Sequence, residues 1–308
     1  MKFRILIPLL LLSFEGRISY AQPVQSADSL LAEVKVITSN AMQELQDWRD
    51  VLNGDNVSSK EESWKRLNNL LWGYRFRLAV IEEPEGDPGY VDAARNLVKF
   101  LYYECDNRLL AVQRFAEGGS RNDSEVKKHQ SLYGDVFSSA RDKHSVLLFY
   151  QAWLVARATV KSPQAFCASV SPMPEIIQNG FPGYKGELLR QINENTAEYR
   201  AAKLFPGAKS GVFREQRGVP TVTYVMYENS DSATVRKQFQ STIFQVLACE
   251  LPGIKGYFYD YDRIENGYTL IQSCYMFFPG SDNVIRVNLR KSEAGKYDAV
   301  LVFGKRGG

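Results

Sequence analysis

Histidine is scarce in this chain of 308 residues, because only His129 and His144 occur. Both fall in one predicted helical segment, and their sequence separation corresponds to about 22 Å along a helix. They therefore cannot share a metal ion, and we interpret each as a partly buried, hydrogen-bonded side chain. The chain also lacks CxxC, HExxH, GxSxG, GxGxxG and phosphate-loop motifs. We accordingly predict no metal and no cofactor.

A run of about 20 apolar residues, long enough to cross a bilayer, is missing as well. The chain begins with Lys2 and Arg4, continues with an apolar run over 5–14, and has small residues before a cleavage position at Ala21. This pattern predicts a secretory signal peptide over residues 1–21. We expect the remaining chain not to span a membrane and to be secreted or periplasmic. An uncleaved N-terminal anchoring helix is the alternative.

Positive and negative side chains are nearly balanced in number. The formal net charge is +3, and residues 1–21 carry three basic and one acidic side chain, so the chain without them carries +1. Nucleic-acid binding needs a basic face that neutralises phosphates. We therefore predict no nucleic-acid partner. The hydrophobic fraction of 44% is that of a globular protein.

Cysteine is sparse, and an exported chain would place it in an oxidising compartment that favours disulfides. Four cysteines allow three full pairings, which spacing alone does not distinguish. The domain division described below favours two bonds, Cys105 with Cys167 and Cys249 with Cys274. Four buried thiols are the alternative, because free cysteine is often buried.

Apolar residues recur at helical spacing through the first two thirds of the chain. Residues 22–206 are predicted to form an all-helical domain, an antiparallel bundle with short connections. Asp87 is expected to cap one of its helices. A last helix is expected over Glu187–Leu204. The long helices are expected at about 28–52, 59–83, 88–117 and 123–160.

After residue 206 the apolar period changes to two. Residues 207–308 are predicted to form two strands, over 211–215 and 221–227, a helix over 231–250 and then a four-stranded meander. Helix and strands are segregated, which favours an antiparallel sheet with the helix packed on one face. The chain as a whole is therefore predicted to be an α+β two-domain protein.

The segment from Gly256 to Gly280 is rich in aromatic residues and contains the hairpin signal Asn266-Gly267. A two-residue loop pairs Tyr257 with Met276 across the hairpin. This register predicts that alternating residues form an apolar face beneath the helix. That face would hold Tyr257, Tyr259, Tyr261, Cys274, Met276, Ile285, Val287 and Leu289.

The same register predicts a mixed aromatic and polar set on the opposite face: Phe258, Asp260, Ser273, Tyr275, Arg286 and Asn288. We interpret this set as a ligand or partner surface with aromatic contacts and polar anchors. An ordinary solvated sheet face is the alternative. The last strand has apolar residues on both sides, so we expect the helical domain to cover part of this second face.

These observations favour an exported, non-enzymatic binding or envelope-associated protein whose partner is a protein or a small ligand. The alternative is an extracytoplasmic hydrolase acting on a glycan or peptide. Its carboxylate pair would be Asp260 and Asp262, about 7 Å apart on one strand face. A histidine acting as general base is the other version of this hypothesis.

Overall fold

The structure is a computed structural model, and it describes residues 27–52, 57–83, 86–87, 89–118, 122–161, 164–249, 251–265 and 267–306. The side chains of residues 27, 28, 57, 58, 261–263 and 265 are also outside the description. The predicted signal peptide lies outside the described residues and stays a prediction. In the part that is described, every helix is too short or too polar to cross a lipid bilayer.

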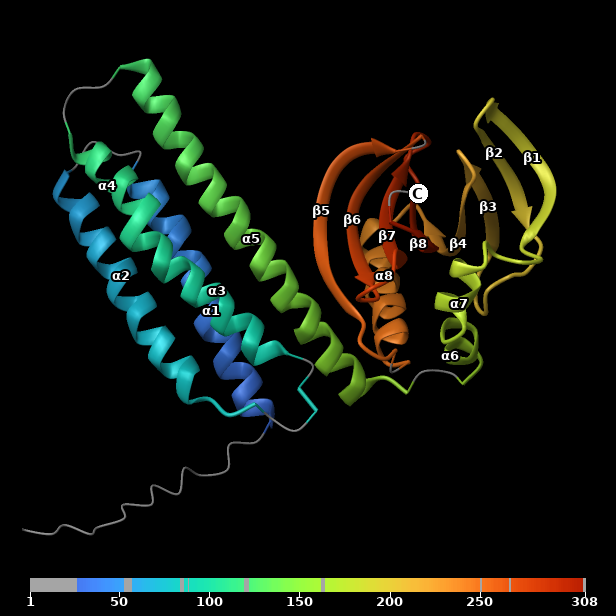
Figure 1. The fold of residues 1–308 in the computed structure, drawn as a ribbon, viewed down its shortest axis with the longest axis horizontal. Helices are drawn as coiled ribbons and strands as arrows, with labels where there is room; N and C mark the ends of the chain where they lie inside the picture. The colour runs from blue at the N-terminus through green and yellow to red at the C-terminus, as the bar shows by residue number, and fades with distance from the viewer. Residues whose placement is uncertain are drawn as a thin grey trace, which may run out of the picture.

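The N-terminal part of the chain consists of long helices packed side by side, as the periodicity predicted (Figure 1). Their inward-facing residues form one apolar core that includes Trp48, Leu71, Leu97 and Val136. The third predicted helix is interrupted by a short π-helical turn. The elements are α1 (Ala27–Leu52), α2 (Val57–Val80), α3 (Tyr90–Glu104), η1 (Cys105–Leu109), α4 (Leu110–Glu117) and α5 (Asp123–Thr159).

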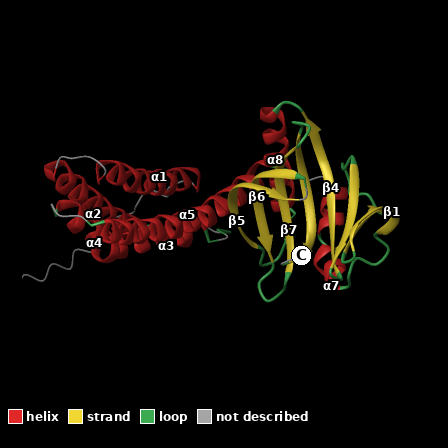
Figure 2. Cartoon of the chain, turned by 90° about the horizontal axis from the view of Figure 1, so that it is seen from above, coloured by secondary structure: helices red, strands yellow, loops and turns green. Residues whose placement is uncertain are grey.

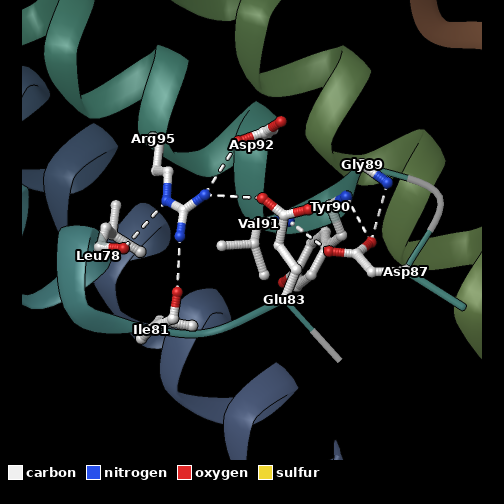
Figure 3. A network of polar contacts seen from close by, with 9 residues as sticks. All are labelled: Leu78, Ile81, Glu83, Asp87, Gly89, Tyr90, Val91, Asp92 and Arg95. Carbon is white, nitrogen blue, oxygen red and sulfur yellow. Dashed lines mark hydrogen bonds and ion pairs between the residues drawn. The ribbon is translucent and has the colours of Figure 1, made fainter. Parts of the chain in front are cut away.

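Arg95 of α3 donates hydrogen bonds to backbone carbonyl groups at the end of α2, where the chain turns between these helices (Figure 3). Its guanidinium donates to the carbonyl oxygens of Leu78 and Ile81 at 3.1 and 2.6 Å. It also pairs with Glu83 at 2.7 Å and Asp92 at 3.0 Å. Carbonyl groups at a helix C-terminus have no partner within the helix. A single arginine therefore caps the C-terminal end of α2 and links this helix to α3.

Asp87 caps the start of α3 from the other side of the same turn (Figure 3). Its carboxylate accepts hydrogen bonds from the backbone N–H groups of Gly89, Tyr90 and Val91 at 2.9, 2.7 and 3.1 Å. These are the donors that a helix leaves without partners at its N-terminus. The predicted cap at Asp87 is confirmed.

The C-terminal part is an eight-stranded antiparallel sheet, preceded by the short helices α6 (Gln164–Val170) and α7 (Met173–Gln178). Its strand order is β1-β2-β3-β4-β8-β7-β6-β5, with helix α8 (Ser232–Leu247) between β4 and β5 in the chain. The predicted α+β class is therefore confirmed. The strands are β1 (Lys185–Asn193), β2 (Thr196–Ala201), β3 (Ser210–Gln216), β4 (Val219–Asn229), β5 (Lys255–Glu265), β6 (Tyr268–Phe277), β7 (Asn283–Ser292) and β8 (Tyr297–Lys305).

The prediction of a helix over Glu187–Leu204 is wrong, because this segment forms the hairpin β1–β2 at the edge of the sheet. Its Leu, Arg, Gln and Glu residues favour a helix intrinsically. The edge strand β1 also shows no alternation of burial, since Leu188, Leu189 and Ile192 are all exposed. Pairing with β2 and β3 overrides the local preference, and residues 185–201 belong to the sheet rather than to the bundle.

The helices pack on one face of the sheet, which we call the covered face. Residues Val287 of β7 and Leu301 of β8 lie on it, together with Val235, Phe239 and Ile243 of α8 in one apolar core. The opposite face, which we call the open face, carries Arg286 and Val302. The prediction that the helix covers an apolar sheet face is confirmed by these contacts.

Helix α5 belongs to both cores and joins the two parts of the molecule side by side (Figures 1 and 2). Val136, Ala140 and Leu147 pack in the bundle core, whereas Phe149 packs in the core of the sheet. The ring of Phe149 lies directly on Gly256 of β5, where an added Cβ would come within 2.4 Å of the ring. Only glycine allows this close approach of helix and strand.

The disulfide joins Cys167 to Cys249, with Cα atoms 5.1 Å apart, so both predicted pairings are wrong. Cys105 and Cys274 are buried thiols, one in the bundle core and one in the core of the sheet. Burial raises the pKa of both thiols well above its ordinary value. The error arose because α6, which carries Cys167, was assigned to the bundle. It packs instead on α8, beside Cys249.

We expect non-reducing peptide mapping to find one peptide linking Cys167 and Cys249, and two free thiols at Cys105 and Cys274. Cys167→Ser should lower the free energy of unfolding by about 3–5 kcal/mol, because the bond closes a long loop in the unfolded chain. Cys274→Ser in the same protein leaves the linked peptide intact and serves as the control. A linked peptide containing Cys105 or Cys274 would contradict the assignment.

Arg95→Met should lower the free energy of unfolding by about 1–3 kcal/mol, since it leaves two carbonyl groups and two carboxylates without their donor. Denaturant unfolding measures the loss. Arg66→Met is the matched control, because Arg66 pairs only at the surface with Glu44 at 2.7 Å, and such pairs contribute less than about 1 kcal/mol. Equal losses in the two variants would refute the capping role.

Candidate functional site

The β5–β6 hairpin follows the predicted register only near its turn. Arg263 pairs with Leu270 and Glu265 with Tyr268, as a two-residue loop requires. A β-bulge then lies between Asp260 and Arg263, and beyond it the register is shifted by one residue. The hairpin signal at Asn266-Gly267 therefore predicted the turn correctly, but it could not predict a bulge further along the strand.

The bulge reverses the faces that the sequence predicted for the first half of β5, because a one-residue shift moves side chains to the other side of a sheet. Tyr257 pairs with Tyr275 rather than with Met276, and Tyr259 pairs with Ser273. Both tyrosines lie on the open face, so their assignment to the core is wrong. Phe258 packs instead against the core of the covered face. The side chain of Tyr261 lies outside the described residues.

The predicted ligand surface is consequently divided between two places. The β6–β7 register is as predicted from Gln272 to Phe277, with Tyr275 opposite Arg286 and Ser273 opposite Asn288, and these residues lie on the open face. Phe258 and Asp260 are on the other side of the sheet, where they line a cleft against α5 and α8. Their placement on the open face is wrong. The sequence around the bulge contains no glycine that would have indicated it.

The open face is concave. Six strand positions separate β1 from β6 in the sheet, which would be about 29 Å in a flat sheet. Arg190 of β1 and Tyr268 of β6 nevertheless line one cavity of about 280 Å³. The sheet therefore curls toward its open face, as the curved ribbons of Figure 1 show. We call this hollow the open-face cavity, and strands alone provide its lining residues.

The curl also explains the burial of the last strand. Val300 and Val302 of β8 point to the open face and retain at most 5% of their surface. Asn288 and Arg286 of β7 flank them on one side, and the residues of β4 flank them on the other. The expectation that the helical part covers this face is wrong, because curvature and long neighbouring side chains bury these valines.

Two carboxylates at the cavity are each held by arginine. Glu198 accepts from Arg190 at 2.5 Å and from the Nε of Arg214 at 2.9 Å. Burial favours the neutral form of Glu198, but the bonds and charges of these arginines outweigh it and lower the pKa of this carboxyl. Asp298 accepts from Arg290 at 2.8 and 3.0 Å. Burial raises the pKa of Asp298 despite that pairing.

Arg286 is the arginine of the cavity that pairs with no carboxylate among the described residues. Its Nε is buried and donates no hydrogen bond to any residue in the described part of the chain. Beside it, Asn288 accepts a hydrogen bond from the Ser273 hydroxyl at 2.7 Å. That bond orients the carbonyl oxygen of the Asn288 amide toward Ser273, and Asn288 itself lines the cavity. The floor of the cavity thus presents a guanidinium and an amide together.

Aromatic rings extend the open face beyond Arg286 toward the β5 edge. Tyr257 and Tyr275 are stacked with ring centroids 5.1 Å apart and planes at 3°. Tyr259 stands edge-on to Tyr257 at 4.7 Å, and Phe277 lies 6.3 Å from Tyr275. Tyr275 is directly opposite Arg286 in the sheet. A flat ligand group bound at the arginine therefore has an aromatic surface next to it.

The cleft on the covered side, which we call the junction cleft, has a volume of about 410 Å³ and lies between α5, α8 and β5. It brings His144 together with Asp260, which are far apart in the sequence. Burial lowers the pKa of His144. His129 lies elsewhere in the bundle, stacked on Phe115 at 3.9 Å and hydrogen-bonded to the backbone oxygen of Glu125 at 2.7 Å.

Among the residues that the structure describes, no group of three or more His, Cys, Asp and Glu side chains could hold a metal ion. No family model matches the chain, and no curated protein or solved structure is significantly similar to it. A functional proposal for this protein therefore has to rest on its own sites.

Paired cysteines test the register of β5. We expect Tyr257→Cys with Tyr275→Cys to form a disulfide on mild oxidation, because directly opposed side chains share a face within bonding distance. Tyr257→Cys with Met276→Cys, the pair that the two-residue loop alone predicts, should stay reduced because the side chains lie on opposite faces. Mass spectrometry of the intact proteins distinguishes them. A bond in the second pair only would contradict the bulge.

Proposed function

We propose that the protein is a non-enzymatic binding protein and that its open-face cavity binds a small ligand carrying a carboxylate or phosphate group. One observation carries the proposal: the guanidinium of Arg286 lines this cavity and has no partner of opposite charge among the described residues. Arginine binds carboxylate and phosphate oxygens through two parallel hydrogen bonds. An anionic ligand would supply the acceptors that this side chain lacks.

The rest of the cavity supports an anion rather than a cation. Four arginines line it, and the two carboxylates at the cavity already pair with three of them. The surplus charge is therefore positive. A volume of about 280 Å³ is near the lower end of small-molecule pockets, roughly 300–1,000 Å³, which favours a small ligand. The arginines are Arg190, Arg214, Arg286 and Arg290.

Export remains part of the proposal. A disulfide between Cys167 and Cys249 is the kind of bond that persists in an oxidising compartment, and this supports a secreted or periplasmic location. An envelope-associated role is equally a proposal. The hydrolase alternative stays a prediction: the side chain of Asp262 lies outside the described residues, and the carboxylate of Asp260 accepts a hydrogen bond from Gln272 at 2.9 Å.

Titration with benzoate tests the anion site, with benzamide as an uncharged probe of the same shape. We expect benzoate to bind more tightly than benzamide, and Arg286→Met to weaken benzoate binding by about tenfold or more, because it removes a charged double hydrogen bond. Ligand-observed NMR measures both dissociation constants. Binding of benzoate should also weaken as salt is added.

Arg306→Met is the matched control, because Arg306 is an exposed arginine that lies over the Phe277 ring at 5.1 Å and does not line the cavity. It changes the net charge by the same amount and should leave benzoate binding unchanged. The proposal fails if wild-type protein does not distinguish benzoate from benzamide. It also fails if the two arginine variants weaken binding equally.

A further inference from the structure

The junction cleft has an apolar part built from three elements. Leu148 and Val155 of α5 are 39% and 37% exposed there, which is unusual for side chains on the inner side of a helix. Phe244 of α8 and Phe258 of β5 stand across from them as half-buried rings. An open cavity between packed elements is a common position for a small-molecule site. These walls would contact an apolar group.

The polar residues of the cleft come from α5, from the sheet and, in Gln240, from α8. Along α5, Arg141 and Ser145 precede the apolar residues Leu148 and Val155 on the cleft lining. Asp260 follows Phe258 by two residues on the same strand face, about 7 Å further along. A ligand lying along α5 would therefore contact both apolar and polar side chains, the polar ones including Gln151 between Leu148 and Val155.

Asp260 is the carboxylate that the sheet contributes to this cleft. Its Oδ1 accepts from the neutral amide of Gln272 at 2.9 Å, and no cation pairs with it in the described part of the chain. The lining also contains one arginine and one further carboxylate, Arg141 and Asp142 of α5, so with Asp260 its acidic side chains outnumber the basic one. Burial lowers the pKa of His144 and so disfavours the protonated form that could compensate Asp260.

We propose that the junction cleft binds a small organic cation, a protonated amine on an apolar body. The free oxygen of Asp260 would accept from the ammonium group, whose charge the Phe258 ring also attracts. The apolar body would pack between Leu148 and Phe244. This site lies on the opposite side of the sheet from the open-face cavity and does not depend on the function proposed for that cavity.

The probe for this site is the 2-phenylethylammonium ion, with 2-phenylethanol as the neutral probe of the same skeleton. We expect the ammonium ion to bind to the full-length protein with a millimolar dissociation constant by ligand-observed NMR. Asp260→Asn should weaken binding of the ammonium ion by about tenfold and leave binding of the alcohol unchanged, because only the charged hydrogen bond is lost. Asparagine has nearly the same size as aspartate, and its side-chain oxygen can still accept the hydrogen bond from the Gln272 amide.

Leu148→Trp fills the cleft and should abolish binding of both probes. Val155→Trp is a second filling variant, to be used if the first one fails to fold by circular dichroism. Arg286→Met, on the other side of the sheet, should leave ammonium binding unchanged, so failure here is distinguishable from failure of the anion site.

Three results would each overturn the proposal: no ammonium binding to wild-type protein at about 10 mM, where a ligand of this size should bind; equal affinity for the two probes; or undiminished binding when a folded filling variant is tested. Unchanged ammonium affinity in Asp260→Asn would also reject the role of this carboxylate.

Discussion

The ring of Phe149 rests on Gly256, and this contact holds the long helix α5 against the edge of the sheet. It requires the glycine to face the helix, on the covered side. Side chains alternate along a strand, so Phe258 and Asp260 must face the same side, and they become the strand contribution to the junction cleft. Tyr257 and Tyr259 must then face the open side. One helix-to-strand contact and the bulge after Asp260 thus decide what each face presents.

The two faces of the sheet consequently differ in electrostatic character. On the open side, curvature gathers arginines from β1, β3 and β7, and Arg286 has no counter-ion among the described residues. On the covered side, the cleft beside α5 contains the carboxylate of Asp260, which among the described residues accepts a hydrogen bond from the amide of Gln272. A concave polar face and a half-open apolar cleft are both costly to leave without ligands, because buried donors and exposed apolar side chains are each unfavourable.

Much of the fold could be predicted from local patterns, since the periodicity of α1, α2, α5 and α8 and the alternation of β6 and β7 reflect one buried face each. The hairpin β1–β2 could not, because both faces of β1 are exposed and its residues favour a helix. The disulfide could not be predicted either, because the pairing of cysteines depends on the packing of α6 on α8 rather than on their spacing in the sequence.

The sequence by itself determined the class of fold, the long helices, the strands that follow residue 206 and the register of β6 with β7 from Gln272 to Phe277, because these depend on turns and periodicities within a few residues. It also named Tyr275, Arg286 and Asn288 as neighbours. Tertiary structure alone decided that Phe258 and Asp260 leave that group. The bulge and the close approach of α5 to Gly256 are set by packing between elements that are distant in the chain, and such contacts leave no periodic pattern in a single sequence.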